Sequence, residues 1–112
     1  MTARLGYVEL PVPDVRAAAA FYSAAFGWTL SEFGPSYAAT TTGDVDIGLQ
    51  GDAAEASTGP LAVITVDDLA AAEAAVISAG GRITRAAFGF PGGSRFHFRD
   101  PSGNELAAMQ PE

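Results

Sequence analysis

Residues 4–28, RLGYVELPVPDVRAAAAFYSAAFGW, join a β-prone segment directly to a helix. The segment 4–12 is short, apolar and typical of a strand. Asp14 can cap the helix that follows, its alanines extend it, and Gly27 can end it. The stretch therefore predicts a β-strand followed by an α-helix.

Three further β-like stretches complete the first half of the chain. They cover residues 28–33, 36–42 and 45–50. Gly-Pro at 34–35 and Gly-Asp at 43–44 separate them, and both dipeptides are turn signals. Residues 1–50 therefore read as one βαβββ module.

The second half repeats this order. Val12-Pro-Asp-Val aligns with Val66-Asp-Asp-Leu, about 54 residues further on, and the small-residue linker 51–60 lies between the modules. The second module covers 61–112 and begins with the strand segment PLAVITV (60–66), in which Leu61 is the first module residue. A capped helix that ends in two glycines follows at 67–81. Three strands at 82–88, 94–98 and 104–109 come next, separated by turns at 89–93 and 100–103. The chain thus predicts a single α+β domain over 1–112, with two βαβββ modules in tandem whose open sheets curve around a concave cleft.

Alternation along the strands predicts which side chains pack under the helices. The apolar set is Val8, Leu10, Val12, Val45, Ile47, Leu49, Phe96, Phe98, Leu106 and Ala108. The opposite set should line the concave side: Tyr7, Glu9, Asp46, Gly48, Gln50, Arg95, His97, Glu105, Ala107 and Met109. We predict that all of these except Gln50 bind a ligand. A polar set on the inner face of several strands favours a ligand cavity or a wet interface.

The composition excludes several functions. The formal charge is −7 and all six basic residues are arginines, so nucleic acid, which requires phosphate neutralisation, is not an expected partner. A neutral or cationic ligand suits this charge better. No apolar run approaches the roughly 20 residues of a membrane span, and no signal-peptide pattern opens the chain, so we expect a cytoplasmic protein without a membrane partner. The absence of cysteine excludes thiolate chemistry.

Two motifs resemble the vicinal oxygen chelate superfamily, which includes glyoxalase I, extradiol dioxygenases, fosfomycin resistance enzymes and bleomycin resistance proteins. They are YVELPVPDVRAAAAFYSAAFGW at 7–28 and FHFRDPSGNELA at 96–107. The resemblance covers nearly the whole chain and implies the tandem βαβββ fold. It leaves the function open, because one scaffold hosts many chemistries.

The resemblance also implies where a metal would bind. The family's enzymes hold one divalent metal through His, Glu or Gln at four positions, which correspond here to Tyr7, Gly48, Leu61 and Ala107. Gly48, Leu61 and Ala107 have no ligating side chain, and a protonated Tyr7 is a poor ligand. We therefore expect no metal and no other cofactor.

His97, the only histidine, leaves three alternatives open. It can be a plain polar wall residue, an acid or base near Glu9 or Glu105, or part of an unorthodox metal site with Glu9, Glu105 or Asp46. An ordinary histidine pKa of about 6.5 suits proton transfer at neutral pH. Among the aromatic residues, Tyr37 and Phe90 are the least core-like, and we predict that they stack on a ligand.

These observations predict a metal-independent small-molecule-binding protein, similar to the bleomycin resistance branch, with a cationic or aromatic ligand. The alternative is a glyoxalase- or dioxygenase-like enzyme (lyase, isomerase or ring-cleaving), with an atypical metal or an acid/base site at the catalytic candidates His97 and Glu9. Whether the protein is an enzyme stays open, as does a purely structural partner domain. Since each open sheet has a second face to occupy, we also expect a homodimer.

Overall fold

The computed structural model describes residues 1–112 and divides the chain into two compact units. We call Tyr7–Leu61 the N-terminal unit, and Met1–Gly6 with Ala62–Glu112 the C-terminal unit. The first six residues therefore group with the second half of the chain, although the repeat places them in the first module. The units are described separately below.

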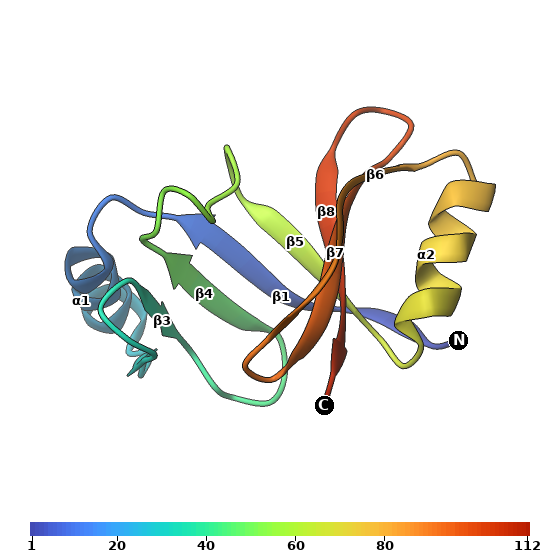
Figure 1. The fold of residues 1–112 in the computed structure, drawn as a ribbon. Coiled ribbons are helices and arrows are strands. Elements are labelled where there is room, and N and C mark those ends of the chain that lie inside the picture. Colours follow the sequence, from blue (N-terminus) through green and yellow to red (C-terminus); the bar gives the residue numbers. More distant parts are fainter. The chain divides into compact units, whose positions relative to one another are not determined.

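The N-terminal unit has one helix on one face of a four-stranded arrangement. Strand β1 (Ala3–Pro11) contributes its residues from Tyr7 onward and pairs in parallel with β4 (Asp46–Gln50). β3 (Tyr37–Ala39) pairs antiparallel with β4, and β2 (Ser31–Glu32) with β3, so the order is β2-β3-β4-β1. Helix α1 (Val15–Phe26) lies against β3 and β4 (Figure 1).

Local chemistry sets the ends of α1 as the sequence predicts. The Asp14 carboxylate accepts a hydrogen bond from the backbone N–H of Ala17 at 3.0 Å. At the other end Gly27 has φ +71°, a left-handed conformation that glycine adopts without strain, and its N–H donates to the Ser23 carbonyl. The helix buries Val15 against Ala38 and Leu49.

The C-terminal unit repeats this order. β5 (Leu61–Val66) pairs in parallel with β8 (Glu105–Pro111), β8 antiparallel with β7 (Gly93–Arg99), and β7 antiparallel with β6 (Arg82–Phe90). Helix α2 (Leu69–Ser78) begins after Asp68, whose carboxylate accepts from the Ala71 N–H at 3.0 Å. The tandem βαβββ prediction is confirmed, with two helices and mixed parallel and antiparallel pairing.

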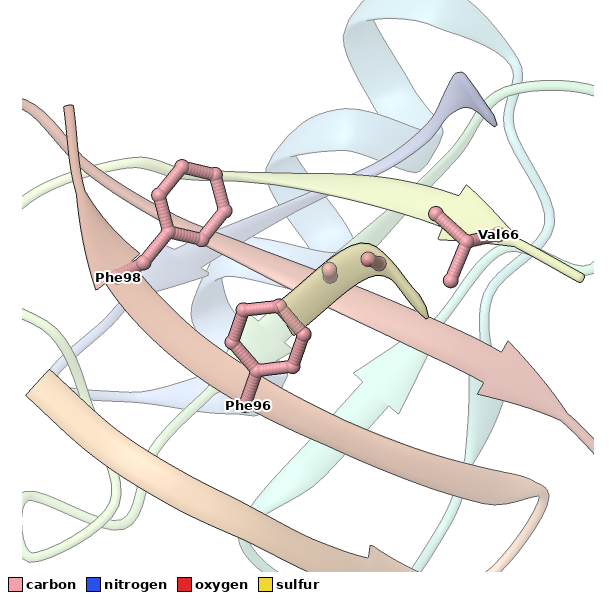
Figure 2. Packing of buried hydrophobic residues seen from close by; sticks show 5 residues of the cluster. Val66, Phe96 and Phe98 are labelled. Carbon is pink, nitrogen blue, oxygen red and sulfur yellow. The ribbon is translucent and has the colours of Figure 1, made fainter. Parts of the chain in front are cut away.

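The core of the C-terminal unit lies between α2 and one face of β7. Phe96 is fully buried, and it packs with Phe98, Val66, Ala72 and Ala108. Figure 2 shows Phe96 and Phe98 projecting from β7 together with Val66 of β5. Strand alternation thus correctly predicted which face of β7 and β8 packs under the helix.

Several predicted strands are shorter or shifted. β2 and β3 keep only two and three residues of the predicted stretches. β3 ends at Ala39 because the following residues form a turn organised by Asp46. Val45, predicted to pack under the helix, is 55% exposed because β4 begins only at Asp46. β6 continues to Phe90, so the predicted loop at 89–93 shrinks to Pro91 and Gly92.

The predicted turn at 100–103 is confirmed. The Gly103 N–H donates to the Asp100 carbonyl at 2.9 Å, and Gly103 has φ +90°. The Asp100 carboxylate accepts from the backbone N–H groups of Ser102 and Asn104 and from the Asn104 side chain. These bonds, the Asn104 side chain first, lower the pKa of Asp100.

Candidate functional site

The polar face of the N-terminal unit brings four of the predicted site residues together. Glu9 of β1 is the cross-strand partner of Gly48 in β4, and Gly48 is in turn opposite Ala39 in β3. Because side chains alternate along strands, Tyr7, Glu9, Gly48 and Tyr37 share the face opposite the buried Leu49.

A chain of hydrogen bonds connects these side chains. The Tyr37 hydroxyl donates to Glu9 Oε2 at 2.9 Å, and the hydroxyls of Tyr7 and Tyr37 are 2.6 Å apart. A phenol has one hydrogen, and Tyr37 directs it to Glu9, so Tyr7 is the donor to Tyr37. Glu9, only 4% exposed, therefore lies at the accepting end of a Tyr7–Tyr37–Glu9 chain.

The electrostatics of this chain keep Tyr37 protonated. Burial raises the pKa of the Tyr37 phenol far above its usual range, and the neighbouring Glu9 charge raises it further. A tyrosinate here would be poorly solvated and would lie against a carboxylate. Tyr37 is thus a permanent neutral donor at any physiological pH.

Gly48 makes this arrangement possible. A Cβ at position 48 would collide with the hydroxyl oxygens of both Tyr7 and Tyr37. Glycine is therefore required by close approach of two side chains, rather than by its own backbone conformation. The space above Gly48 holds the phenol oxygens.

Asp46, another predicted ligand residue, organises a turn in this structure. Its carboxylate accepts from the Thr40 hydroxyl at 2.7 Å, from the Thr42 hydroxyl at 2.8 Å, and from the backbone N–H groups of Thr42 and Gly43. Slight burial of the carboxylate acts to raise the pKa of Asp46, but these hydrogen bonds outweigh it, so the pKa is lowered. Both of its oxygens already stabilise residues 40–46.

The C-terminal unit presents the other predicted residues on one face of β7 and β8. Arg95 is opposite Met109, and His97 is opposite Ala107. His97 is 4% exposed, and its Nδ1 lies 3.9 Å from Glu105 Oε2, which also accepts from the Thr84 hydroxyl at 3.2 Å. The small side chain of Ala107 leaves room for the imidazole beside it.

Two arginines lie over phenylalanine rings on the same face. Arg85 is 3.7 Å from the centroid of Phe88, and Arg95 is 5.5 Å from that ring and 5.7 Å from Phe90. The Phe88 ring is 5.9 Å from the imidazole of His97. These distances fit cation–π contacts, so the rings and guanidinium groups form one stack.

The sequence did not lead us to select Arg85 or Phe88 as site residues. The register between β6 and β7 shifts twice, between Ile83 and Arg85 and again between Arg85 and Phe88. Such irregularities break the two-residue period on which alternation depends. The run of aromatic residues at Phe88 and Phe90 was the available signal.

The residues at the family's metal positions do not fit a metal ion. The Tyr7 phenol donates to Tyr37, and Gly48 has no side chain and no space for one. Leu61 and Ala107 are buried apolar residues, at 1% and 0% exposure. No group of three or more His, Asp or Glu side chains gathers elsewhere to hold a metal. The side chains at these positions therefore do not support a metal-dependent reaction step.

A pocket of about 400 Å³ in the C-terminal unit lies apart from these residues. Its lining includes Arg4, Asp67 and Gln110. The Asp67 carboxylate accepts from the Thr2 N–H, and the Gln110 side chain accepts from the Leu69 N–H at the start of α2. These polar groups therefore hold the chain termini and the helix in place.

Two consecutive βαβββ modules, each with its first strand parallel to its last and a helix on one face, define a tandem-module α+β class. The family model for the Glyoxalase/Bleomycin resistance protein/Dioxygenase superfamily matches residues 4–108, and the chain belongs to this superfamily. No curated protein matches the chain. Neither helix is long and apolar enough to cross a membrane.

Solved structures share the fold at low sequence identity. Methylmalonyl-CoA epimerase from Mycobacterium tuberculosis is 18% identical with a TM-score of 0.75, over 96% of this chain and 87% of that one. A superfamily member from Vibrio splendidus 12B01 is 18% identical with a TM-score of 0.71, over 97% and 99%. The Mn(II)-bound glyoxalase from Novosphingobium aromaticivorans is 21% identical with a TM-score of 0.69, over 97% of this chain and 40% of that protein.

Proposed function

We propose that this protein binds a small organic molecule, cationic or aromatic, without the metal ion that the superfamily's enzymes use. The observation that carries the proposal is the Tyr7–Tyr37–Glu9 hydrogen-bond chain above Gly48. It is a preformed cluster of two half-buried phenols and one buried carboxylate. Ligand sites are typically built this way, from aromatic walls with a few fixed polar groups.

The charge of this surface favours a cation. Glu9 is 4% exposed, so its charge acts through little water and is weakly screened. Aromatic ring faces also attract cations. A chain of formal charge −7 raises the local concentration of cationic ligands.

On the C-terminal unit, the face of β7 and β8 with the adjoining end of β6 is proposed to bind an aromatic group independently. Phe90, Arg95, His97 and Met109 combine planar, polarisable and apolar groups there. Planar guanidinium and ring systems stack on aromatic molecules. Glu105 and Ala107 frame His97 on this face.

The experiment is a thermal-shift screen with a broad panel of cationic aromatic compounds, followed by calorimetric titration of the hits. A ligand that binds the folded protein raises its Tm, by an amount that grows with the logarithm of the ligand concentration divided by Kd. We expect Glu9→Gln to weaken binding at least about tenfold, because a charge-assisted contact is lost. Glu73→Gln on α2 makes the same charge change elsewhere and should leave the affinity unchanged. A panel without a single Tm increase contradicts the proposal.

Metal independence has its own test. Chelator-stripped protein is titrated calorimetrically with zinc, nickel, manganese and ferrous ions. We expect no stoichiometric binding, because Tyr7, Gly48, Leu61 and Ala107 offer no ligand set. Tight one-to-one binding that disappears in His97→Ala would reveal a relocated metal site and overturn this part of the proposal.

A second candidate function is acid–base catalysis at His97. The observation favouring it is the 3.9 Å separation of His97 Nδ1 and Glu105 Oε2, since a carboxylate beside an imidazole orients it for proton transfer. Glu9 is the second catalytic candidate, on the N-terminal unit. Any turnover that survives both His97→Ala and Glu9→Gln would exclude this function.

A further inference from the structure

The cavity of about 400 Å³ in the C-terminal unit is lined by two opposite charges that do not pair with each other. Arg4 of β1 and Asp67, which follows β5, both line it, and no salt bridge joins them. In Figure 1 the start of the chain lies beside the link from β5 to α2, where both charges are carried. Opposite charges that line one cavity without meeting can be bridged by a ligand.

Gly6 brings two hydrogen-bond donors together on one side of this cavity. A Cβ at position 6 would collide with the hydroxyl oxygen of Thr65 and would lie 3.6 Å from Nη1 of Arg4. Both side chains line the cavity, and both use the space that a larger residue at position 6 would fill. A guanidinium group matches the geometry of a carboxylate, and a hydroxyl can donate to it as well. This side of the cavity is therefore suited to a carboxylate.

Asp67 offers the complementary acceptor. One oxygen of its carboxylate accepts from the backbone N–H of Thr2 at 2.9 Å. This hydrogen bond is the main cause that lowers the pKa of Asp67, so the group is ionised at neutral pH. A carboxylate has about four acceptor positions, so Asp67 can hold an ammonium group in addition to the Thr2 N–H.

The rest of the lining is fixed and partly apolar. The Gln110 side chain uses its oxygen to accept from the Leu69 N–H at 2.8 Å, which leaves its two amide hydrogens to donate to a ligand. Ala3, Val66 and Pro111 add apolar surface. A volume of about 400 Å³ lies near the lower end of the roughly 300–1,000 Å³ of small-molecule sites. The cavity therefore suits a ligand with few heavy atoms.

We propose that this cavity binds a free aliphatic amino acid as a zwitterion, with the carboxylate on Arg4 and Thr65 and the ammonium on Asp67. Spacing supports this ligand. Thr65 and Asp67 are two residues apart at the end of β5, so their side chains start roughly 7 Å from each other. An amino acid with a hydrogen bond of about 2.9 Å at each end can span such a separation. The site is distinct from the ligand site proposed above and does not rest on it.

The test is calorimetric titration of the full chain with L-alanine, L-valine and L-leucine. We expect one-to-one binding of at least one of them. If L-valine binds, L-valinamide lacks the carboxylate and N-acetyl-L-valine lacks the ammonium, so each should bind at least about tenfold more weakly. The corresponding derivatives of L-alanine or L-leucine are used if that amino acid binds instead.

Variants assign the two ends of the ligand. Arg4→Gln and Asp67→Asn should each weaken binding of the amino acid at least about tenfold, because each removes a charge-assisted contact. Arg4→Gln should leave the affinity for the amide unchanged, since the amide has no carboxylate to lose. Arg82→Gln and Glu73→Gln make the same charge changes elsewhere in the C-terminal unit and should leave the amino-acid affinity unchanged.

Circular dichroism verifies that the variants fold. If Asp67→Asn unfolds, Thr65→Val tests the cavity instead, because valine keeps the β-branched shape and removes only the hydroxyl. It should weaken binding of the amino acid and leave the affinity for the amide unchanged. The proposal is overturned if none of the three amino acids binds at millimolar concentration. It is also overturned if the amide and the N-acetyl derivative bind as tightly as the amino acid, or if folded Arg4→Gln keeps the full affinity.

Discussion

The two units have the same topology and different chemistry on their polar faces. In the N-terminal unit, neutral phenols donate in sequence to one buried carboxylate above a glycine. In the C-terminal unit, Ala107 of β8 takes the place of Gly48 and is the cross-strand partner of His97. Beside it, Arg85 and Arg95 lie over the ring of Phe88. The difference teaches that packing under the helix preserves the fold, while the opposite face is free to diverge.

The largest expected effects test the shared cores. Phe96→Ala should lower the free energy of unfolding by about 3–5 kcal/mol, because a fully buried ring leaves a cavity. Leu49→Ala, also fully buried, should cost about 2–5 kcal/mol in the N-terminal unit. Urea denaturation measures both. A loss under about 1 kcal/mol at either site would contradict the assigned core.

Gly48→Ala gives β4 the residue that β8 has at Ala107, and it should destabilise the N-terminal unit. We expect a loss of about 1–3 kcal/mol, because the new methyl group displaces the hydroxyls of Tyr7 and Tyr37. Combined with Tyr37→Phe, the total loss should be smaller than the sum of the two single losses, since one of the colliding oxygens is gone. Urea midpoints measure the change. A single variant as stable as the wild type would show that the tyrosines do not occupy this space.

Tyr37→Phe should destabilise the protein by about 1–2 kcal/mol at neutral pH, because the hydrogen bond from Tyr37 to the buried Glu9 is lost. The same residue predicts a pH dependence. The folded pKa of Tyr37 is raised above its unfolded value near 10, so the unfolded state ionises first and stability falls as the pH rises past about 10.

The measurement is the urea midpoint at pH 9 and at progressively higher pH. The decline should be shallower in Tyr37→Phe than in the wild type, whereas Tyr22→Phe serves as a control with an unchanged slope. If the urea midpoint fell equally with pH in the wild type and in Tyr37→Phe, the Tyr7–Tyr37–Glu9 hydrogen-bond chain would be refuted.

The smallest effects should be equal in the two units. Asp14 and Asp68 cap their helices in the same way: each carboxylate accepts a 3.0 Å hydrogen bond from the backbone N–H of the residue three positions later in the chain. Asp14→Ala and Asp68→Ala should each cost about 1 kcal/mol. Thermal unfolding compares them directly. If one substitution lowered stability clearly more than the other, the two caps would not be equivalent, although their hydrogen-bond geometry is the same.

The repeat, the caps and the buried faces could be predicted because they depend on local patterns. Asp14 and Asp68 precede alanine-rich runs, and Phe96 and Phe98 alternate with polar residues. The early end of β3 could not be predicted, since the hydrogen bonds from Thr40 and Thr42 to Asp46 replace strand pairing with a turn.

The sequence predicted which strand face the candidate site residues share, but it did not predict which side chains hydrogen-bond to one another. Alternation placed Tyr7, Glu9 and Gly48 together, and Tyr37 was selected as poorly suited to the core. The hydrogen bonds among them depend on distances across three strands, which no sequence spacing encodes. Arg85 and Phe88 were not selected as site residues, and two register shifts in β6 break the alternation that would have indicated their face.

The close approach at Gly48 also limits how this protein can change. A histidine, glutamate or glutamine introduced at position 48 would meet both phenol oxygens before it could reach a metal. Tyr7 and Tyr37 would have to be replaced in the same step, and Glu9 would then lose its donor. Three substitutions are thus coupled by epistasis, and mutational paths that alter position 48 alone lead through a less stable protein.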